Sequence, residues 1–194
     1  MVRGLAGQLR RRSSHPVVAA EPNAAAAAAQ TPAAIAAWKD LEARFDPGCI
    51  GIIVEPGPAA TVAAAILVEG CRGGPMPGAI ALVGYAAEFL ATCLQLAPAC
   101  ERGLDPGGDA QRRRPASTIE LPPMMIFMPS DDPAIAACAH ACRRLRAAGI
   151  ATGLEIVGAV RERPSDIAAV ATELAGEIEA FFDANLIHYL PRHL

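Results

Sequence analysis

Short runs of apolar residues alternate along the chain with longer segments in which apolar positions recur every three or four residues. A short apolar run between Gly and Pro residues is typical of a buried strand, and the longer spacing is typical of a helix face. The predicted strands cover residues 50–54, 79–83, 124–128 and 154–157, and the predicted helices cover residues 35–45, 59–68, 134–148 and 165–182. Apolar strands that alternate with helices predict an α/β fold, a three-layer sandwich with a mostly parallel sheet covered on both faces.

The predicted elements fit into one domain, which we place at residues 18–190. Residues 1–17 are expected to form a disordered N-terminal tail. The tail contains an arginine run at 10–12, so an organellar targeting signal is the alternative interpretation. Residues 97–117 are rich in Pro, Gly and Arg, which predicts a mobile surface loop inside the domain.

The charge balance excludes two classes of partner. The formal net charge is −3, which gives no long-range attraction to phosphate backbones or anionic lipids. We therefore expect no nucleic-acid partner. No stretch reaches the roughly 18 uninterrupted apolar residues needed to cross a bilayer, so we expect no membrane association through a spanning helix.

The six cysteines are scattered, mostly inside apolar runs, and form no C-x-x-C pair. We expect them to be reduced core residues, which favours a cytoplasmic location. A metal site could be imagined at Cys138, His140 and Cys142. On a helix, however, Cys138 and Cys142 share one face while His140 points roughly the opposite way. We therefore expect no metal and no cofactor.

Candidate chemistry belongs just after the predicted strands, because open parallel sheets bind ligands outside the carboxyl ends of their strands. Three such segments matter here, at residues 55–59, 130–133 and 158–163. The first is a sharp Glu-Pro-Gly-Pro-Ala turn that leads into a helix rich in small residues. The second contains two aspartates ahead of a proline.

Four segments keep the order and spacing of a known esterase family. Residues 46–50 read Asp-Pro-Gly-Cys-Ile ahead of the turn at Gly57, and residues 76–82 read Met-Pro-Gly-Ala-Ile-Ala-Leu. Residues 121–126 read Leu-Pro-Pro-Met-Met-Ile, and an Asp-Pro pair follows at Asp132. This order resembles the hormone-sensitive-lipase-like branch of the α/β-hydrolases, whose members are carboxylic ester hydrolases. The resemblance spans about residues 18–187 and implies a truncated α/β-hydrolase-like fold.

The residues at two of the three catalytic positions depart from the family. The resemblance places the nucleophile at Gly57, or at Pro56 after a shift of one residue, the acid at Asp132, and the base at Glu162. Neither glycine nor proline can attack a carbonyl. The segment 50–68 contains no Ser or Cys.

The other two positions also serve catalysis poorly. Glu162 lies between two arginines, so it would stay ionised and would be a poor proton shuttle near neutral pH. Asp132 fits the family's acid, and it fits equally well a helix cap beside Pro133. The family's oxyanion loop, H-G-G-G, would precede residue 18, and residues 1–14 do not contain it.

We therefore expect a catalytically degenerate α/β-hydrolase-fold protein that acts as a binding or interaction module. A small acyl or ester ligand is the expected partner, and the strands missing from its N-terminal side would leave an open sheet edge that favours a homodimer. One alternative is an active hydrolase of short-chain esters that uses Asp132 with Glu162, or His188 from the C-terminal tail. Another is a decayed fragment without a selected role.

Overall fold

Five strands form one parallel sheet in the computed structural model, which describes residues 17–19, 27–101, 120–158 and 164–186. The strands are β1 (Val17–Ala19), β2 (Gly51–Val54), β3 (Ala79–Val83), β4 (Met124–Pro129) and β5 (Thr152–Val157). They lie in the order β1-β2-β3-β4-β5, and each pairs in parallel with the next. All of them therefore end at the same edge of the sheet.

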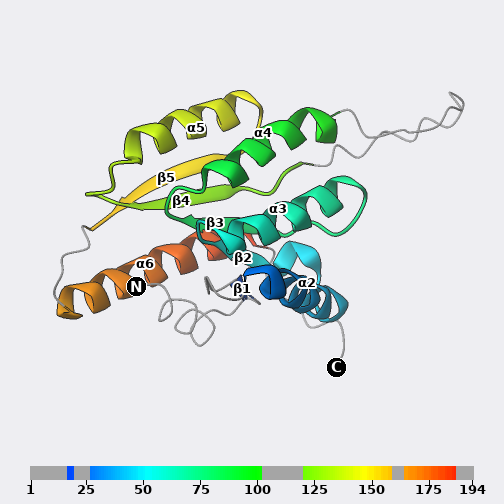
Figure 1. Cartoon of the computed structure of the whole chain (residues 1–194), viewed down its shortest axis with the longest axis horizontal. Helices are drawn as coiled ribbons and strands as arrows, with labels where there is room; N and C mark the ends of the chain where they lie inside the picture. Colours follow the sequence, from blue (N-terminus) through cyan, green and yellow to red (C-terminus); the bar gives the residue numbers. More distant parts are fainter. Residues whose placement is uncertain (1–16, 20–26, 102–119, 159–163, 187–194) are drawn as a thin grey trace, which may run out of the picture.

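The helices form layers on both faces of the sheet (Figure 1). They are α2 (Ala27–Arg44), the short 3-10 helix η1 (Pro47–Cys49), α3 (Pro58–Cys71), α4 (Ala87–Glu101), α5 (Ile135–Ala147) and α6 (Pro164–Asn185). Because each strand lies beside its predecessor, right-handed connections place α2, α3, α4 and α5 on one face. Of the described helices, only α6 packs on the other face.

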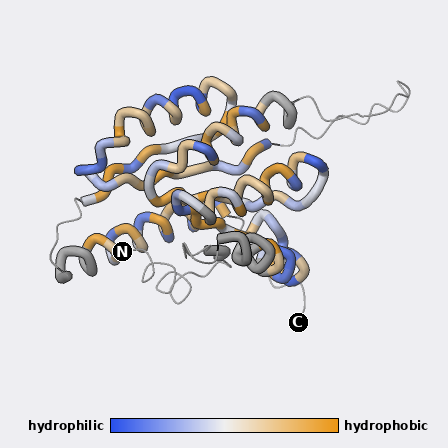
Figure 2. The backbone as a smooth tube through the Cα atoms, in the orientation of Figure 1, coloured by the Kyte–Doolittle hydropathy of each residue, from blue (hydrophilic) through white to orange (hydrophobic). Residues whose placement is uncertain are grey.

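Strand β2 shows how the sequence builds these two layers. Its side chains alternate, so Ile52 and Val54 enter the core beneath the four helices, while Ile53 enters the core beneath α6. Gly51 also faces α6, and a Cβ atom there would lie 2.8 Å from the ring of Phe182. Glycine therefore lets the fully buried Phe182 pack directly on the sheet. Figure 2 shows hydrophobic and hydrophilic residues alternating along the helices, as expected for helices with one buried and one exposed face.

The four predicted strands and the four predicted helices are confirmed, and so is the α/β sandwich with a parallel sheet. One helix was missed. The prediction of a loop at 97–117 is wrong for residues 97–101, which complete α4, and residues 102–117 lie outside the described part. Proline removes one helical hydrogen bond, but Phe89, Leu90 and Cys93 bury the face of α4 that precedes Pro98.

The N-terminal boundary also needs a correction. Val17 was assigned to the tail at 1–17, but it begins β1 and pairs with Gly51 of β2. Residues 1–16 lie outside the described part. The segment was missed because a run of three strand residues is too short to give a periodic signal. Among the helices of the described residues, none combines the length and apolar character needed to cross a membrane.

Candidate functional site

The turn between β2 and α3 contains Gly57, the residue that the resemblance assigns to the nucleophile position. Gly57 is the N-cap of α3 and has φ 97° and ψ −138°, a backbone conformation that side chains disfavour. Its carbonyl accepts hydrogen bonds from the backbone N–H groups of Ala60 and Thr61, at 3.0 and 3.3 Å. The chain thus makes a sharp strand-to-helix turn at the carboxyl edge of the sheet, with a glycine at its apex.

Open space surrounds this apex. Gly57 is exposed, and a Cβ atom built on it would meet no atom within 4 Å. Any side chain here would therefore project freely above the sheet edge, as the hydroxyl of a nucleophile elbow must do. The turn has the backbone for such a residue and lacks the side chain.

Thr61 is the nearest hydroxyl along the chain, one turn inside α3. Its side chain is exposed, and its hydroxyl makes no hydrogen bond to any described residue. A threonine hydroxyl becomes a nucleophile only when an adjacent base takes its proton. No described residue is placed to do so by hydrogen bonding.

Asp132 lies in the turn between β4 and α5, half-buried. Its Oδ1 accepts a hydrogen bond from the N–H of Ala134 at 2.8 Å, and its own N–H donates to the carbonyl of Pro129 at 3.0 Å. The carbonyl of Asp132 accepts from the N–H of Ile135 at 3.3 Å. The carboxylate therefore closes a local turn just before α5. The expected helix cap at Asp132 is not observed, because α5 begins at Ile135 and its N-cap is Ala134, which has no side-chain cap bond.

Gly57 and Asp132 lie at the same edge of the sheet, as the resemblance implies. Strand β3 separates β2 from β4, so the axes of the two strands are two spacings apart, about 10 Å. Glu162, the predicted base position, falls outside the described residues, and so do His15, His188 and His193. His140 is exposed on α5. The pair Gly73-Gly74 follows the C-terminal end of α3, at the opposite end of that helix from Gly57.

Helix α5 contains a pair of cysteines whose interaction the sequence analysis missed. Cys138 and Cys142 are both buried beneath the helix. A hydrogen bond from Cys138 lowers the pKa of Cys142 to about 7, and the charges of Arg146 and Arg143 act in the same direction against desolvation. The same hydrogen bond, together with burial and the nearby charge of Asp132, raises the pKa of Cys138. The i, i+4 spacing was the available signal, because it places both thiols on one face.

The other described cysteines are ordinary core residues. Cys49, Cys71 and Cys93 are buried thiols that form no disulfide with a described residue. Burial raises the pKa of the Cys93 thiol to about 12. In the part of the chain that the structure describes, no group of three or more His, Cys, Asp or Glu side chains is arranged to hold a metal ion.

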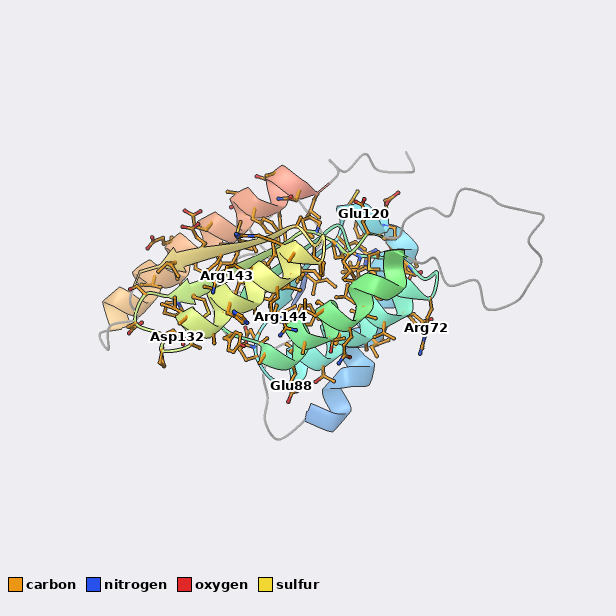
Figure 3. The ribbon with its side chains drawn as sticks, turned by 90° about the horizontal axis from the view of Figure 1, so that it is seen from above. Arg72, Glu88, Glu120, Asp132, Arg143 and Arg144 are labelled. Atoms are coloured by element: carbon orange, nitrogen blue, oxygen red, sulfur yellow. The ribbon has the colours of Figure 1, made fainter. Side chains whose placement is uncertain are left out.

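Two pockets flank α3 at its two ends. The smaller, of about 160 Å³, lies between α3 and α4 and begins one turn after Gly57. Its lining residues are Ala60, Thr61, Ala64, Glu88, Phe89 and Thr92. The larger, of about 560 Å³, lies between α2 and the second half of α3, with Trp38, Ile66 and Arg72 among its lining residues. Only the smaller pocket adjoins the carboxyl edge of the sheet; in Figure 3, Arg72 lies far from Asp132.

No protein-family model matches the sequence, and no curated protein sequence matches it. Among solved structures, the chain is similar to an esterase from the bacterial hormone-sensitive lipase family, with a TM-score of 0.51 and 16% identity over 81% of this chain and 60% of that chain. It is similar to a hormone-sensitive lipase homologue from a metagenome library, with a TM-score of 0.50 and 19% identity over 80% of this chain and 61% of that chain.

A third similar structure is carboxyl esterase 2 from the mycorrhizal fungus Tuber melanosporum, with a TM-score of 0.53 and 16% identity over 95% of this chain and 72% of that chain. At such identities the likeness shows the fold. The resemblance found in the sequence is confirmed at that level: the chain has an α/β-hydrolase-like fold. It spans about 60% of the length of the first two solved chains.

Proposed function

We propose that the protein is a binding module with an α/β-hydrolase-like fold that does not hydrolyse esters by an elbow nucleophile. The observation that carries this proposal is Gly57, a residue without a side chain at the apex of the strand-to-helix turn. Removing the nucleophile of a hydrolase leaves little beyond binding effects. A chain that keeps the turn and lacks the nucleophile retains a ligand-binding edge without the reaction.

The state of the neighbouring groups supports the same conclusion. The carboxylate of Asp132 accepts a hydrogen bond from the backbone N–H of Ala134, so it already has a structural role in the turn before α5. The hydroxyl of Thr61 makes no hydrogen bond to a described base. Acyl transfer needs a nucleophile, a base within hydrogen-bond reach and an orienting acid, and the described residues do not assemble that chain of contacts.

The ligand we propose is a short acyl or ester group in the small pocket beside the turn. The pocket volume of about 160 Å³ is well below the roughly 300–1,000 Å³ of sites for drug-sized ligands, so it suits a chain of few carbon atoms. Phe89 and the alanines offer apolar contacts, while Thr61 offers a hydroxyl donor for a carbonyl; the hydroxyl of Thr92 donates to the carbonyl of Glu88 at 3.0 Å. Both features match a small ester.

Two assays test this proposal together. Methyl butyrate titrated into labelled protein should shift the amide resonances of residues 60–64 and 88–92, and Ala64→Phe should abolish the shifts by filling the pocket. Gln95→Phe, on an exposed position of α4 outside the pocket, is the matched control. Nitrophenyl acetate and nitrophenyl butyrate should be hydrolysed no faster than in the presence of a heat-unfolded sample.

The hydrolase alternative has a distinct signature in the same assays. Saturable turnover that disappears in Asp132→Asn or Thr61→Ala would overturn the proposal of a non-catalytic protein. Turnover that neither substitution changes would be assigned to a contaminant only if it also separates from the protein during further purification. Turnover that stays with the protein would overturn the proposal as well.

Self-association is part of the proposed function. Strand β1 pairs with β2 on one side, and its other side is an outer edge of the described sheet. Open edges favour pairing with another chain, and a second copy would close this one. Sedimentation at micromolar concentration should give a dimer; a monomer over the whole range would contradict this part of the proposal.

A further inference from the structure

The opposite edge of the sheet, formed by β5, presents backbone groups in a known direction. The N–H of Met124 donates to the carbonyl of Ala151 at 2.8 Å, and the N–H of Ser130 donates to the carbonyl of Val157 at 3.0 Å. Alternate residues of a strand direct their backbone groups to the same side, so Gly153 and Glu155 also face β4. Thr152, Leu154 and Ile156 therefore direct their N–H and C=O groups outward.

One end of this outer edge is already satisfied. Nε of Arg146 donates to the carbonyl of Thr152. The backbone groups of Leu154 and Ile156 have no hydrogen-bond partner among the described residues. The side chain of Ile156 is also 44% exposed, more than any other large apolar side chain in the described part of the chain. The edge therefore offers an unpaired ladder and an apolar contact at the same place.

Helix α5 adds positive charge beside this edge. On α5, Cys142 and Leu145 face the sheet. Ala141 and Ala148 lie on one flank of α5 and pack against the hydrophobic core that also contains residues of α4. Arg143 lies on the opposite flank, toward β5, whereas Arg144 lies on the side toward α4 (Figure 3). Neither arginine forms an ion pair with a described residue. The edge of β5 is thus flanked by the guanidinium groups of Arg143 and Arg146.

These charges disfavour a second copy as the occupant. Two β5 strands paired antiparallel around a two-fold axis would bring two α5 helices side by side on one face of the sheet. Arg143 of each copy would then face the other copy, and like charges placed opposite each other are destabilising. An acidic segment meets no such repulsion and gains from both guanidinium groups.

We infer that the outer edge of β5 binds an extended acidic segment of a partner protein as an additional strand, with its acidic side chains on the α5 face. Backbone pairing with Leu154 and Ile156 supplies the affinity, as in other strand-addition complexes. Arg143 and Arg146 select carboxylate side chains on that face. On the α6 face the exposed Glu155 favours uncharged or basic side chains. This inference does not rest on the proposed function.

Two fluorescein-labelled peptides of eight residues test the charge preference on the full chain. One alternates Glu with Thr and the other alternates Lys with Thr. The Glu peptide should give a saturable rise in fluorescence anisotropy that weakens with added salt, and the Lys peptide should give none. Equal binding of both peptides, or no binding of the Glu peptide at millimolar protein, would overturn the inference.

Substitutions at Ile156 test the backbone ladder. The N–H of Ile156 faces outward, so Ile156→Pro removes no hydrogen bond to β4 and is compatible with an edge strand. It should abolish binding of the Glu peptide, while Ile156→Val, which keeps the N–H, should bind it as the wild type does. Unchanged binding by a folded Ile156→Pro protein would overturn the inference. So would a wild-type dimer that Ile156→Pro dissociates, because a second copy would then occupy the edge.

A pair of charge reversals keeps the test decisive if the proline variant fails to fold. Arg143→Glu should weaken binding of the Glu peptide about fivefold, since an exposed charge pair contributes up to about 1 kcal/mol. Arg144→Glu makes the same change in net charge on the other flank of α5 and should weaken binding by less than about twofold. Equal effects of the two substitutions would show a nonspecific charge effect and overturn the inference.

Discussion

Two strand-turn-helix units of the same sheet, β2–α3 and β4–α5, differ in the backbone of their turns and in the polar side chains they contain. The β2–α3 unit has the sharp turn with a positive φ at Gly57. Its helix α3 contains no titratable side chain before Glu69, because the first three turns consist of apolar residues and Thr61. The β4–α5 unit contains two aspartates in its turn, and two neighbouring thiols and three arginines on its helix. The β2–α3 unit has one carboxylate near its turn, the buried Glu55, so most of the polar groups lie in the other unit.

The reactive groups of the β4–α5 unit are engaged in structure. Asp132 closes the turn before α5, and Arg146 donates to the carbonyl of Thr152. Cys138 and Cys142 are buried beneath α5, where Cys142 contacts the carbonyl of Gly153. The comparison teaches that packing and local hydrogen bonds hold the sheet and its turns in the described part of the chain, where no nucleophile, base and acid are joined by hydrogen bonds.

The largest change in stability is expected when a side chain is added at Gly57, in the turn between β2 and α3. Gly57→Val should lower the free energy of unfolding by about 2 kcal/mol, since a β-branched residue at positive φ is strained. Urea denaturation measures the loss. Gly176→Val is the matched control, because Gly176 lies in α6 with open space around it and valine suits a helix at least as well as glycine does. A Gly57→Val protein as stable as the wild type would contradict the strained geometry of the turn.

A smaller effect is expected at the second turn. Asp132→Ala removes the acceptor for the N–H of Ala134 and should cost about 1 kcal/mol of unfolding free energy. Asp132→Asn keeps an acceptor oxygen and should cost much less. The exposed neighbour Asp131 provides the control Asp131→Ala, which should leave thermal and urea stability unchanged. If Asn costs as much as Ala, the negative charge of Asp132 has a role beyond this hydrogen bond.

The smallest effect concerns pH and the thiol pair of α5. The folded pKa of Cys142 is about 7, below the roughly 8.5 of a thiol in an unfolded chain. Its ionisation therefore stabilises the fold above about pH 8.5, and this contribution is lost as the pH falls through about 7. The stability difference between wild type and Cys142→Ser, measured by urea denaturation under reducing conditions, should be larger at pH 8.5 than at pH 6.5.

Cys93→Ser is the control for this pH dependence. The pKa of Cys93 is raised to about 12, so its thiol stays protonated over the same range and the cost of substitution should not change with pH. A stability difference for Cys142→Ser that is equal at both pH values would show that the folded protein does not favour the thiolate.

The sequence was sufficient for most of the sheet and insufficient for its first strand and one helix. Strands β2, β3 and β4 are continuous apolar runs between turn residues, which is the pattern of a sheet buried on both faces. Strand β5 is an edge strand with an exposed Glu155, and its apolar residues Leu154, Ile156 and Val157 were the signal that predicted it. Strand β1 has three residues, and its position depends on pairing with β2. Helix α4 was not predicted, because Pro98 indicates a helix break. The helix forms nevertheless, since burial of residues such as Phe89 stabilises it.

The sequence predicted where the candidate site residues lie, but it did not predict their backbone angles or hydrogen bonds. The spacing of the turns indicated Gly57 and Asp132, and both lie at the carboxyl edge of the sheet. The positive φ of Gly57 and the hydrogen bond of Asp132 to Ala134 depend on three-dimensional geometry, which no sequence motif specifies. The role of Glu162 stays a prediction, since it lies outside the described residues.

The most direct test of the central claim is covalent labelling with a fluorophosphonate, which reacts with activated hydroxyl nucleophiles of serine hydrolases. Full-length protein incubated with excess reagent and analysed by intact mass should show no adduct, because Gly57 has no side chain and the Thr61 hydroxyl has no described base. A stoichiometric adduct that is lost on heat unfolding, at Thr61 or at any other residue, would show an assembled nucleophile and contradict the account.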